Sequence, residues 1–263
     1  MPVITIISDR SSEDFFLGRL KGQILKACPN ISIVDLAHNI GKHSVSKAAF
    51  ILKNSWKHFP DGTVHLIGVD SESTEKKAHI IAEIGNQFFI AADNGLFSLV
   101  FENDIKSVIK VKIGNSTKTK VPALFEFGRI ACEIVNGSPL NSFGDQTNEM
   151  KRLLAINPTF GDDYIVGNLI YTDSYSNAVT NITYELFNEI SQGRAYRIYA
   201  GTSGYSINSL CLNYSDVEPG ELLAMFNSLG LLEIAMNQGE ISKLFSFTNE
   251  TKIRVEFYDS QNS

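Results

Sequence analysis

Two kinds of segment alternate along the first half of the chain, and this alternation constrains the fold most. Residues 3–8, 31–36 and 63–69 are short runs rich in β-branched side chains, which are typical of strands. Between them, residues 15–27 and 44–59 carry apolar side chains at helical spacing. Strands that alternate with helices predict a largely parallel central sheet covered by helices, the α/β fold class.

The pattern changes in the second half of the chain. A polar, turn-rich stretch, NSFGDQTNEMKRLLAINPTFGDD, precedes short strand-like runs at close intervals. That spacing is typical of a small β-rich, barrel-like domain. We therefore expect an N-terminal α/β domain over residues 1–145, a linker over 146–162 and a smaller C-terminal β-barrel-like domain over 163–263.

The composition excludes several classes of function. The net charge is −6, and the basic residues are scattered, so the chain has no basic stripe that would bind nucleic acid. No apolar stretch is long enough to span a bilayer, and the start of the chain lacks the features of a signal peptide. Cys28, Cys132 and Cys211 lie far apart in apolar contexts, which is typical of reduced buried thiols. We expect a cytoplasmic protein without membrane or nucleic-acid partners.

Two carboxylates stand where predicted parallel strands end. Asp9 follows the first strand and Asp70 the third, and ligands of open α/β sheets bind outside those strand ends. A single aspartate at such a place is usually a turn former, but two in one sheet favour a working site. The turn ADNG around Asn94 and the polar stretch DSYSNAVTN from Asp173 are further candidates.

Other motifs are missing. The five histidines show no spacing typical of metal ligands, and the glycines form neither a Walker loop nor a dinucleotide fingerprint. We therefore expect no metal. The residues alone predict a small-molecule site containing carboxylates, in either an enzyme or a binding module.

Six motifs in order resemble the family of S-adenosylmethionine hydroxide adenosyltransferases, which are relatives of the fluorinating and chlorinating enzymes. The motifs are SDRSSEDFFLGRLKGQIL, IVDLAHNI, FPDGTVHLIGVD, FIAADNGLFSLV, IYTDSYSNAVTNI and NSLGLLEIAMNQG. The resemblance implies an α/β domain joined to a β-barrel. It also implies a homotrimer whose active sites lie between the N-terminal domain of one subunit and the C-terminal domain of its neighbour.

The resemblance assigns ligand contacts residue by residue. Asp9 matches the carboxylate that holds the ribose hydroxyls, and Asp173 the acid that pairs with the methionine ammonium. Tyr175 matches an aromatic residue beside the adenine, and Asn177 an amide that contacts the nucleoside. Ser228 matches a contact to the methionine carboxylate, and the Met236 and Asn237 backbone matches the segment that reads the adenine edge. Asn94 is expected in or next to the site.

The resemblance also implies the reaction. In this family a nucleophile attacks C5′ of S-adenosylmethionine and expels L-methionine, and water as nucleophile yields adenosine. Asp70 matches the aspartate that orients water in the hydroxide enzymes, whereas the halogenating relatives have an aromatic residue there. A carboxylate would repel a halide.

Three positions depart from the family pattern in this chain. The basic partner of Asp70 is expected to be an arginine, and Lys76 is the better match to it. The expected histidine falls on Pro122 without gaps, or near Glu126 with a gap. Leu229 stands where the halogenating relatives have an arginine that contacts the methionine carboxylate. We predict a hydrolase that forms adenosine through Asp70 and Lys76. The alternative is a homologue that binds S-adenosylmethionine or adenosine without turnover, as a sensor or scavenger.

Overall fold

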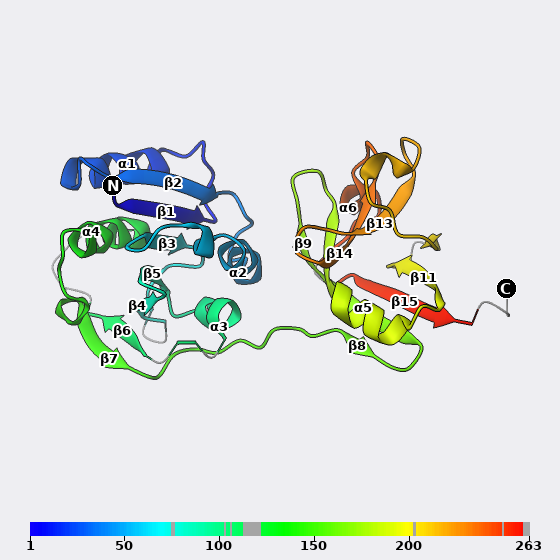
Figure 1. The fold of residues 1–263 in the computed structure, drawn as a ribbon. Coiled ribbons are helices and arrows are strands. Elements are labelled where there is room, and N and C mark those ends of the chain that lie inside the picture. Colours follow the sequence, from blue (N-terminus) through cyan, green and yellow to red (C-terminus); the bar gives the residue numbers. More distant parts are fainter. Residues whose placement is uncertain are drawn as a thin grey trace. The chain divides into compact units, whose positions relative to one another are not determined.

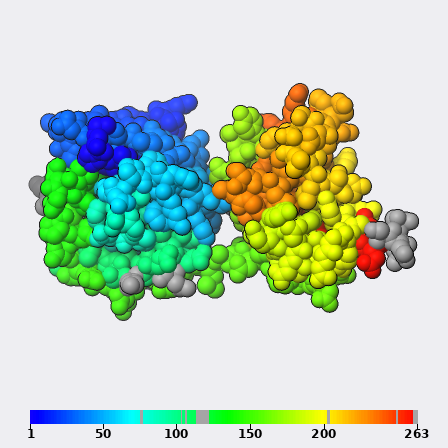
Figure 2. All heavy atoms as spheres, in the orientation of Figure 1, coloured from blue at the N-terminus to red at the C-terminus, as the bar shows by residue number. Residues whose placement is uncertain are grey.

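The chain forms two compact units, Met1–Leu154 and Ala155–Ser263. The computed structural model describes residues 1–74, 77–102, 104–105, 107–112, 122–201, 204–248 and 250–259. The first unit is coloured blue through green in Figures 1 and 2, and the second yellow-green through red. The division falls inside the range 146–162 that was expected to link two domains. The domain limits themselves stay a prediction.

The first unit is built around one mixed sheet. Its elements are β1 (Val3–Ser8), α1 (Phe15–Ala27), β2 (Ser32–Ala37), α2 (Val45–Lys53), the 3-10 helix η1 (Trp56–His58), β3 (Val64–Gly68), β4 (His79–Ile84), β5 (Gln87–Ala92), α3 (Leu96–Phe101), β6 (Val108–Val111), α4 (Ala123–Val135), the 3-10 helix η2 (Leu140–Ser142) and β7 (Gly144–Thr147). The strand order is β2-β1-β3-β5-β4-β6-β7. The first four strands in this order run parallel, and the others pair antiparallel.

Helices cover both faces of this sheet (Figure 1). Neighbouring residues of a strand point to opposite faces. Accordingly, Leu66 packs in a core with α1 and α4, while the next residue, Ile67, packs in a second core with α2 and α3. Both side chains are fully buried. Burial on both faces explains why β1, β3 and β5 are largely apolar, whereas the edge strand β2 is only partly buried. This burial leaves the strand ends as the place for polar groups.

The second unit is an antiparallel sheet. Its elements are β8 (Thr159–Phe160), β9 (Tyr164–Thr172), β10 (Ala178–Thr183), α5 (Tyr184–Ser191), β11 (Ala195–Ala200), β12 (Ser206–Ile207), the 3-10 helix η3 (Tyr214–Asp216), β13 (Leu222–Phe226), β14 (Leu231–Met236), α6 (Ile241–Leu244) and β15 (Lys252–Tyr258). The order is β12-β11-β15-β9-β10-β14-β13, with β8 on β9. A bridge between Leu210 and Ala224 links the two ends of this order, so the sheet is nearly a closed barrel.

The predicted fold class is therefore confirmed: an α/β part with parallel strands and a barrel-like β part. Three α-helices differ from the prediction, of which α6 is a single short turn that was not predicted. The helix expected over residues 44–59 ends at Lys53, with Asn54 as its C-cap, and the chain continues into the 3-10 helix η1. Helix α5 was not predicted, although Thr183 caps it by accepting a hydrogen bond from the Leu186 amide. Among the described residues, no helix is both long and apolar enough to cross a membrane.

Candidate active site

The carboxyl ends of the parallel strands β1, β2, β3 and β5 bring four polar residues to one edge of the sheet. Asp9 follows β1, His43 lies in the loop after β2, and Asp70 and Asn94 follow β3 and β5. The sequence predicted three of them, all except His43. We call Asp9, His43, Asp70 and Lys77 the edge cluster.

Asp9 fixes the backbone of the edge cluster. Its Oδ2 accepts a hydrogen bond of 3.1 Å from the backbone amide of Asp70 and one of 3.3 Å from that of His43. One carboxylate oxygen therefore joins loops that follow two different strands. Because a carboxylate has several acceptor positions, Asp9 keeps capacity to accept further donors.

Asp70 is held by two basic side chains. The Lys77 Nζ atom lies 2.8 Å from Asp70 Oδ1 and donates to the Asp70 backbone carbonyl at 2.8 Å. His43 Nδ1 lies 3.0 Å from the same Oδ1. Partial burial acts to raise the pKa of Asp70, but the hydrogen bonds and charges of Lys77 and His43 outweigh it and lower that pKa. The carboxyl is therefore ionised at neutral pH.

The predicted basic partner, Lys76, lies outside the described residues. The described ion pair is made by its neighbour, Lys77. The two lysines are neighbours in the sequence, and the resemblance favoured Lys76 over Lys77.

The backbone of the edge cluster is strained at two positions. His43 has a φ of 57° and Asp70 a φ of 43°, in the left-handed region that non-glycine residues seldom adopt. Each such residue costs on the order of 1 kcal/mol or more and persists where surrounding contacts enforce it, which is common at functional sites. Here the Asp9 carboxylate and the Asp70–His43 contact supply that enforcement.

Asn94 and His79 brace the loop that carries Asp70. The Asn94 amide donates to the Val69 carbonyl at 2.9 Å and accepts from the Leu96 amide at 3.1 Å, so it ties the end of β5 to the end of β3. His79 Nε2 lies 2.9 Å from the Ser71 carbonyl. Burial lowers the pKa of His79 despite a hydrogen bond and a charge that raise it, so its ring is neutral at pH 7.

Neither residue that aligns with the family histidine offers a free functional group. Pro122 occupies the N-cap of α4. Glu126 receives two hydrogen bonds from Arg129, of 2.6 and 3.3 Å, which form a bidentate ion pair on the same helix. Within the described part of the chain, His43 supplies the imidazole that contacts Asp70.

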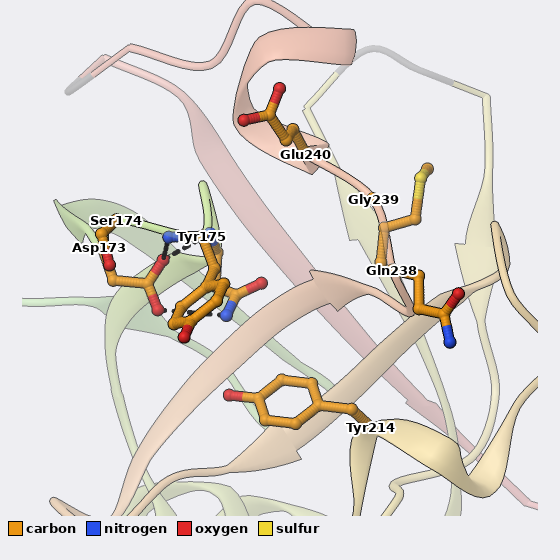
Figure 3. A pocket seen from close by; sticks show the side chains of 9 residues that line it. Asp173, Ser174, Tyr175, Tyr214, Gln238, Gly239 and Glu240 are labelled. Carbon is orange, nitrogen blue, oxygen red and sulfur yellow. Dashed lines mark hydrogen bonds between the residues drawn. The ribbon is translucent and has the colours of Figure 1, made fainter.

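The second unit contains a cavity of about 640 Å³. It is lined by residues from three segments: Asp173, Ser174, Tyr175, Asn177, Tyr214, Met236, Gln238, Gly239 and Glu240. In Figure 3 the loop bearing Asp173 and Tyr175 faces Gln238, Gly239 and Glu240, with Tyr214 below. The lining combines carboxylates, aromatic rings and a thioether without a lysine or arginine, so it suits a ligand with a cationic end and an apolar part.

Asp173 organises its own loop. Its Oδ1 accepts from the backbone amides of Tyr175 at 2.9 Å and Asn177 at 2.8 Å, and its Oδ2 accepts from Asn177 Nδ2 at 3.0 Å (Figure 3). These neutral donors fix the carboxylate without neutralising its charge. Asn177 is buried, whereas Tyr175 is 75% exposed and open to a partner.

Tyr214 has a buried support that the sequence did not reveal. Its hydroxyl donates to Glu233 Oε1 at 2.7 Å, and Asn227 Nδ2 donates to Glu233 Oε2 at 3.1 Å. Burial, together with the carboxylates of Glu233 and Asp173, raises the pKa of Tyr214, which keeps its hydroxyl protonated. Asn227 also accepts from the Leu229 amide, so Glu233 indirectly fixes the turn between β13 and β14.

The predicted contacts of the last motif lie in different settings. Met236 lines the cavity, but Ser228 is exposed in the turn between β13 and β14 and is not part of the lining. The Asn237 side chain donates to the Val217 carbonyl at 2.7 Å, and its backbone amide donates to the Glu221 carbonyl. Asn237 thus stabilises the loop beside the cavity.

No metal centre is evident in the part of the chain that the structure describes. Among the described residues, no group of three or more His, Cys, Asp or Glu side chains is arranged to hold an ion. The expectation of metal-free chemistry stays a prediction.

The regions that match known proteins cover nearly the whole chain. Residues 4–144 match the model of the SAM hydroxide adenosyltransferase N-terminal domain, and residues 167–254 match that of the C-terminal domain. A crystal structure of an uncharacterized conserved protein from Thermotoga maritima superposes with a TM-score of 0.83 at 26% identity. It covers 97% of this chain and 99% of its own.

Two curated relatives illustrate the range of names in the family. A protein of Methanocaldococcus jannaschii named (R)-S-adenosyl-L-methionine hydrolase is 25% identical, over 97% of this chain and 96% of its own. A fluorinase of Nocardia brasiliensis is 21% identical, over 97% of each chain. With both family models matched in order, the chain belongs to the SAM hydroxide adenosyltransferase family.

Proposed function

We propose that this protein hydrolyses S-adenosylmethionine. Water attacks C5′ of the ribose, the C5′–S bond breaks, and adenosine and L-methionine are released. The observation that carries the proposal is the ionised Asp70 at the end of β3, paired with Lys77 and hydrogen-bonded to His43. Such a group orients a water molecule, and the sulfonium is already a good leaving group, so the protein mainly positions the reactants.

Asp70 also favours water over a halide. Two like charges in contact repel by on the order of several kcal/mol at the effective dielectric of a partly buried site. A halide next to Asp70 would meet this repulsion, whereas water would find an acceptor. The proposal therefore follows the hydrolases among the relatives rather than the fluorinases.

The ligand contacts inferred from the family resemblance are part of the proposal. Asp9 would accept hydrogen bonds from the ribose hydroxyls with the capacity left beyond its two backbone contacts. Asp173 would pair with the methionine ammonium, since its charge is fixed by neutral donors alone. Tyr175 would stack on the adenine, and Asn177 would contact the nucleoside.

The remaining contacts are proposed with narrower roles. Ser228 would bind the methionine carboxylate. Met236 and Asn237 would border the adenine. Asn94 acts by holding the ends of β3 and β5 together. Lys76 is proposed as a second source of positive charge near Asp70.

Two further properties are proposed from the relatives. Several are named for the (R) form of S-adenosyl-L-methionine, so we propose a preference for that configuration at sulfur. We also propose the homotrimer of the resemblance, with each site shared between neighbouring subunits. Sedimentation equilibrium at several concentrations tests the trimer.

The test of the function is incubation of the purified chain with each sulfonium diastereomer separately. Chromatography should show adenosine and methionine in equal amounts, more from the (R) form, and far less with Asp70→Asn. Ligand-induced thermal stabilisation without adenosine would instead favour the binding homologue. If neither diastereomer stabilises the protein and neither is turned over, both the hydrolase and the binding-homologue readings are contradicted.

A further inference from the structure

We propose that His43 is the general base of the reaction, with Nε2 taking a proton from the attacking water. The proposal rests on the hydrolysis proposed above and adds a residue from the loop after β2. Its geometric basis is the 3.0 Å contact between His43 Nδ1 and Asp70 Oδ1.

The contact fixes the tautomer of the imidazole. An ionised carboxylate only accepts hydrogen bonds, so His43 Nδ1 carries the proton and donates it to Asp70. In the neutral ring, Nε2 then has its lone pair available. Nε2 makes no hydrogen bond to any other residue among those described, and the side chain is 73% exposed. Water therefore reaches the basic nitrogen.

Asp70 is a weaker candidate for the base. Its Oδ1 is engaged by both Lys77 and His43, and Lys77 also donates to the backbone carbonyl of the same residue. A carboxylate in this arrangement orients the imidazole and stabilises the imidazolium that forms, as in other aspartate–histidine pairs. Its lowered pKa agrees with that role.

His79, the other histidine near the loop, is poorly placed for the task. It is 5% exposed, its Nε2 is engaged with the Ser71 carbonyl, and its ring packs edge-on against Phe127 at 4.8 Å between centroids. A bulk water molecule does not reach it. His79 acts through the Ser71 backbone, which places it among the positioning residues.

The backbone around His43 indicates that its place is enforced. The residue adopts a φ of 57°, and its amide donates to Asp9 Oδ2 at 3.3 Å. The same Asp9 oxygen holds the Asp70 amide, so both members of the pair are fixed to one anchor. Pre-organisation of this kind, with its cost in strain, is common where a side chain must meet a substrate.

The proton balance of the step is closed. The water oxygen forms a bond to C5′, and the electrons of the C5′–S bond move to sulfur, which leaves as the neutral thioether of methionine. The water proton goes to His43 Nε2, and the imidazolium is stabilised by Asp70. Because the ring is exposed, the proton then passes to solvent and no further reactant is needed.

The positive φ of His43 suggests two informative substitutions. His43→Asn keeps a side-chain donor for Asp70 but removes the base, and asparagine tolerates this backbone region. His43→Gly fits the same φ and leaves space for free imidazole. Adenosine formation by wild type and both variants is measured with increasing imidazole, and with pyrazole, a ring of similar size that is a far weaker base.

We expect both variants to lose kcat by about 100-fold, within the usual range for a general base, with KM little changed. Imidazole should accelerate His43→Gly but neither His43→Asn nor wild type, and pyrazole should not. Wild-type kcat in His43→Asn would overturn the proposal, as would a failure of imidazole to rescue His43→Gly. If wild type itself forms no adenosine, the proposed hydrolysis fails first.

Discussion

The two units hold their key carboxylates in different ways. Asp70 in the first unit is held by charged or ionisable side chains, Lys77 and His43, whereas Asp173 in the second is held by two backbone amides and the Asn177 side chain. A carboxylate coupled to titratable partners suits proton transfer and water orientation. One fixed by neutral donors keeps its charge for a ligand. We therefore propose that the edge cluster of the first unit carries the chemistry, and that Asp173 of the second unit acts in ligand binding.

Asp70→Asn tests the chemical half of this comparison and has the largest expected effect. Asparagine keeps the size but loses the charge that pairs with Lys77 and stabilises His43, so kcat should fall by about 10²- to 10⁴-fold. KM should change little. Steady-state kinetics measures both, with Asp61→Asn, in an exposed turn, as the control. A larger change in KM than in kcat would reverse the assigned role.

Asp173→Asn tests the binding half. Loss of a charged hydrogen bond to an ammonium costs about 1.5–3 kcal/mol, so KM should rise by about 10- to 150-fold. Asparagine Oδ1 still accepts from the two backbone amides, and rotation of the Asn177 amide restores an acceptor for the new Nδ2. The loop is therefore kept, and kcat should fall much less. Asp162→Asn, on the exposed surface of the same unit, is the matched control. An unchanged KM would remove Asp173 from the binding site.

The units should also respond differently to acid. All five histidines lie in the first unit, and burial lowers the pKa of His65 to about 4, although its hydrogen bond to Gln87 acts in the opposite direction. Because the unfolded chain binds the proton more readily, stability falls as pH decreases from about 6.5 toward 4. Between pH 7 and pH 5 the loss from His65 should be on the order of 2 kcal/mol.

Fluorescence of Trp56, the single tryptophan, follows unfolding of the first unit in urea at each pH. His65→Gln should reduce the pH dependence, even though the variant is less stable at pH 7. His58→Gln, at an exposed position, should leave that dependence unchanged. Equal pH dependence in wild type and His65→Gln would show that His65 does not cause it.

The smallest predicted effect distinguishes Lys76 from Lys77, which are adjacent in the sequence. Lys77→Met removes a partly exposed ion pair with Asp70, which contributes about 1 kcal/mol, so kcat should fall about fivefold. Lys77→Arg should retain most of the activity because the charge remains. Lys76→Met measures how much Lys76 contributes to kcat. A larger loss there than in Lys77→Met would assign the functional cation to Lys76.

Local patterns predicted much of the first unit. Helix α1 begins and ends where its apolar spacing does, Phe15–Ala27, because its buried face repeats clearly and Pro29 follows. Helix α5 was missed because it is short and follows β10 without a break, so its apolar residues read as part of a β-rich region. Short segments contain too few residues for a period to emerge.

A different limit, contact between residues far apart in the sequence, explains which members of the edge cluster the sequence indicated. Asp9 and Asp70 were predicted because each is the first charged residue after an apolar, strand-like run. His43 was not predicted, because its contact with Asp70 joins residues 27 positions apart and depends on the loop after β2 opening beside the end of β3. The strand order brings His43 and Asp70 together, and neither local sequence predicts that order. Glu233 was not predicted for a similar reason, since its hydrogen bond with Tyr214 joins residues 19 positions apart.

The central claim is that this chain directs water to C5′ of S-adenosylmethionine. The most direct test is turnover of the (R) and (S) diastereomers in ¹⁸O-labelled water, followed by mass spectrometry of the nucleoside. The account predicts adenosine with one ¹⁸O atom in its 5′ hydroxyl, together with unlabelled methionine, and almost none of either with Asp70→Asn. Unlabelled adenosine, or no adenosine from either diastereomer, would contradict it.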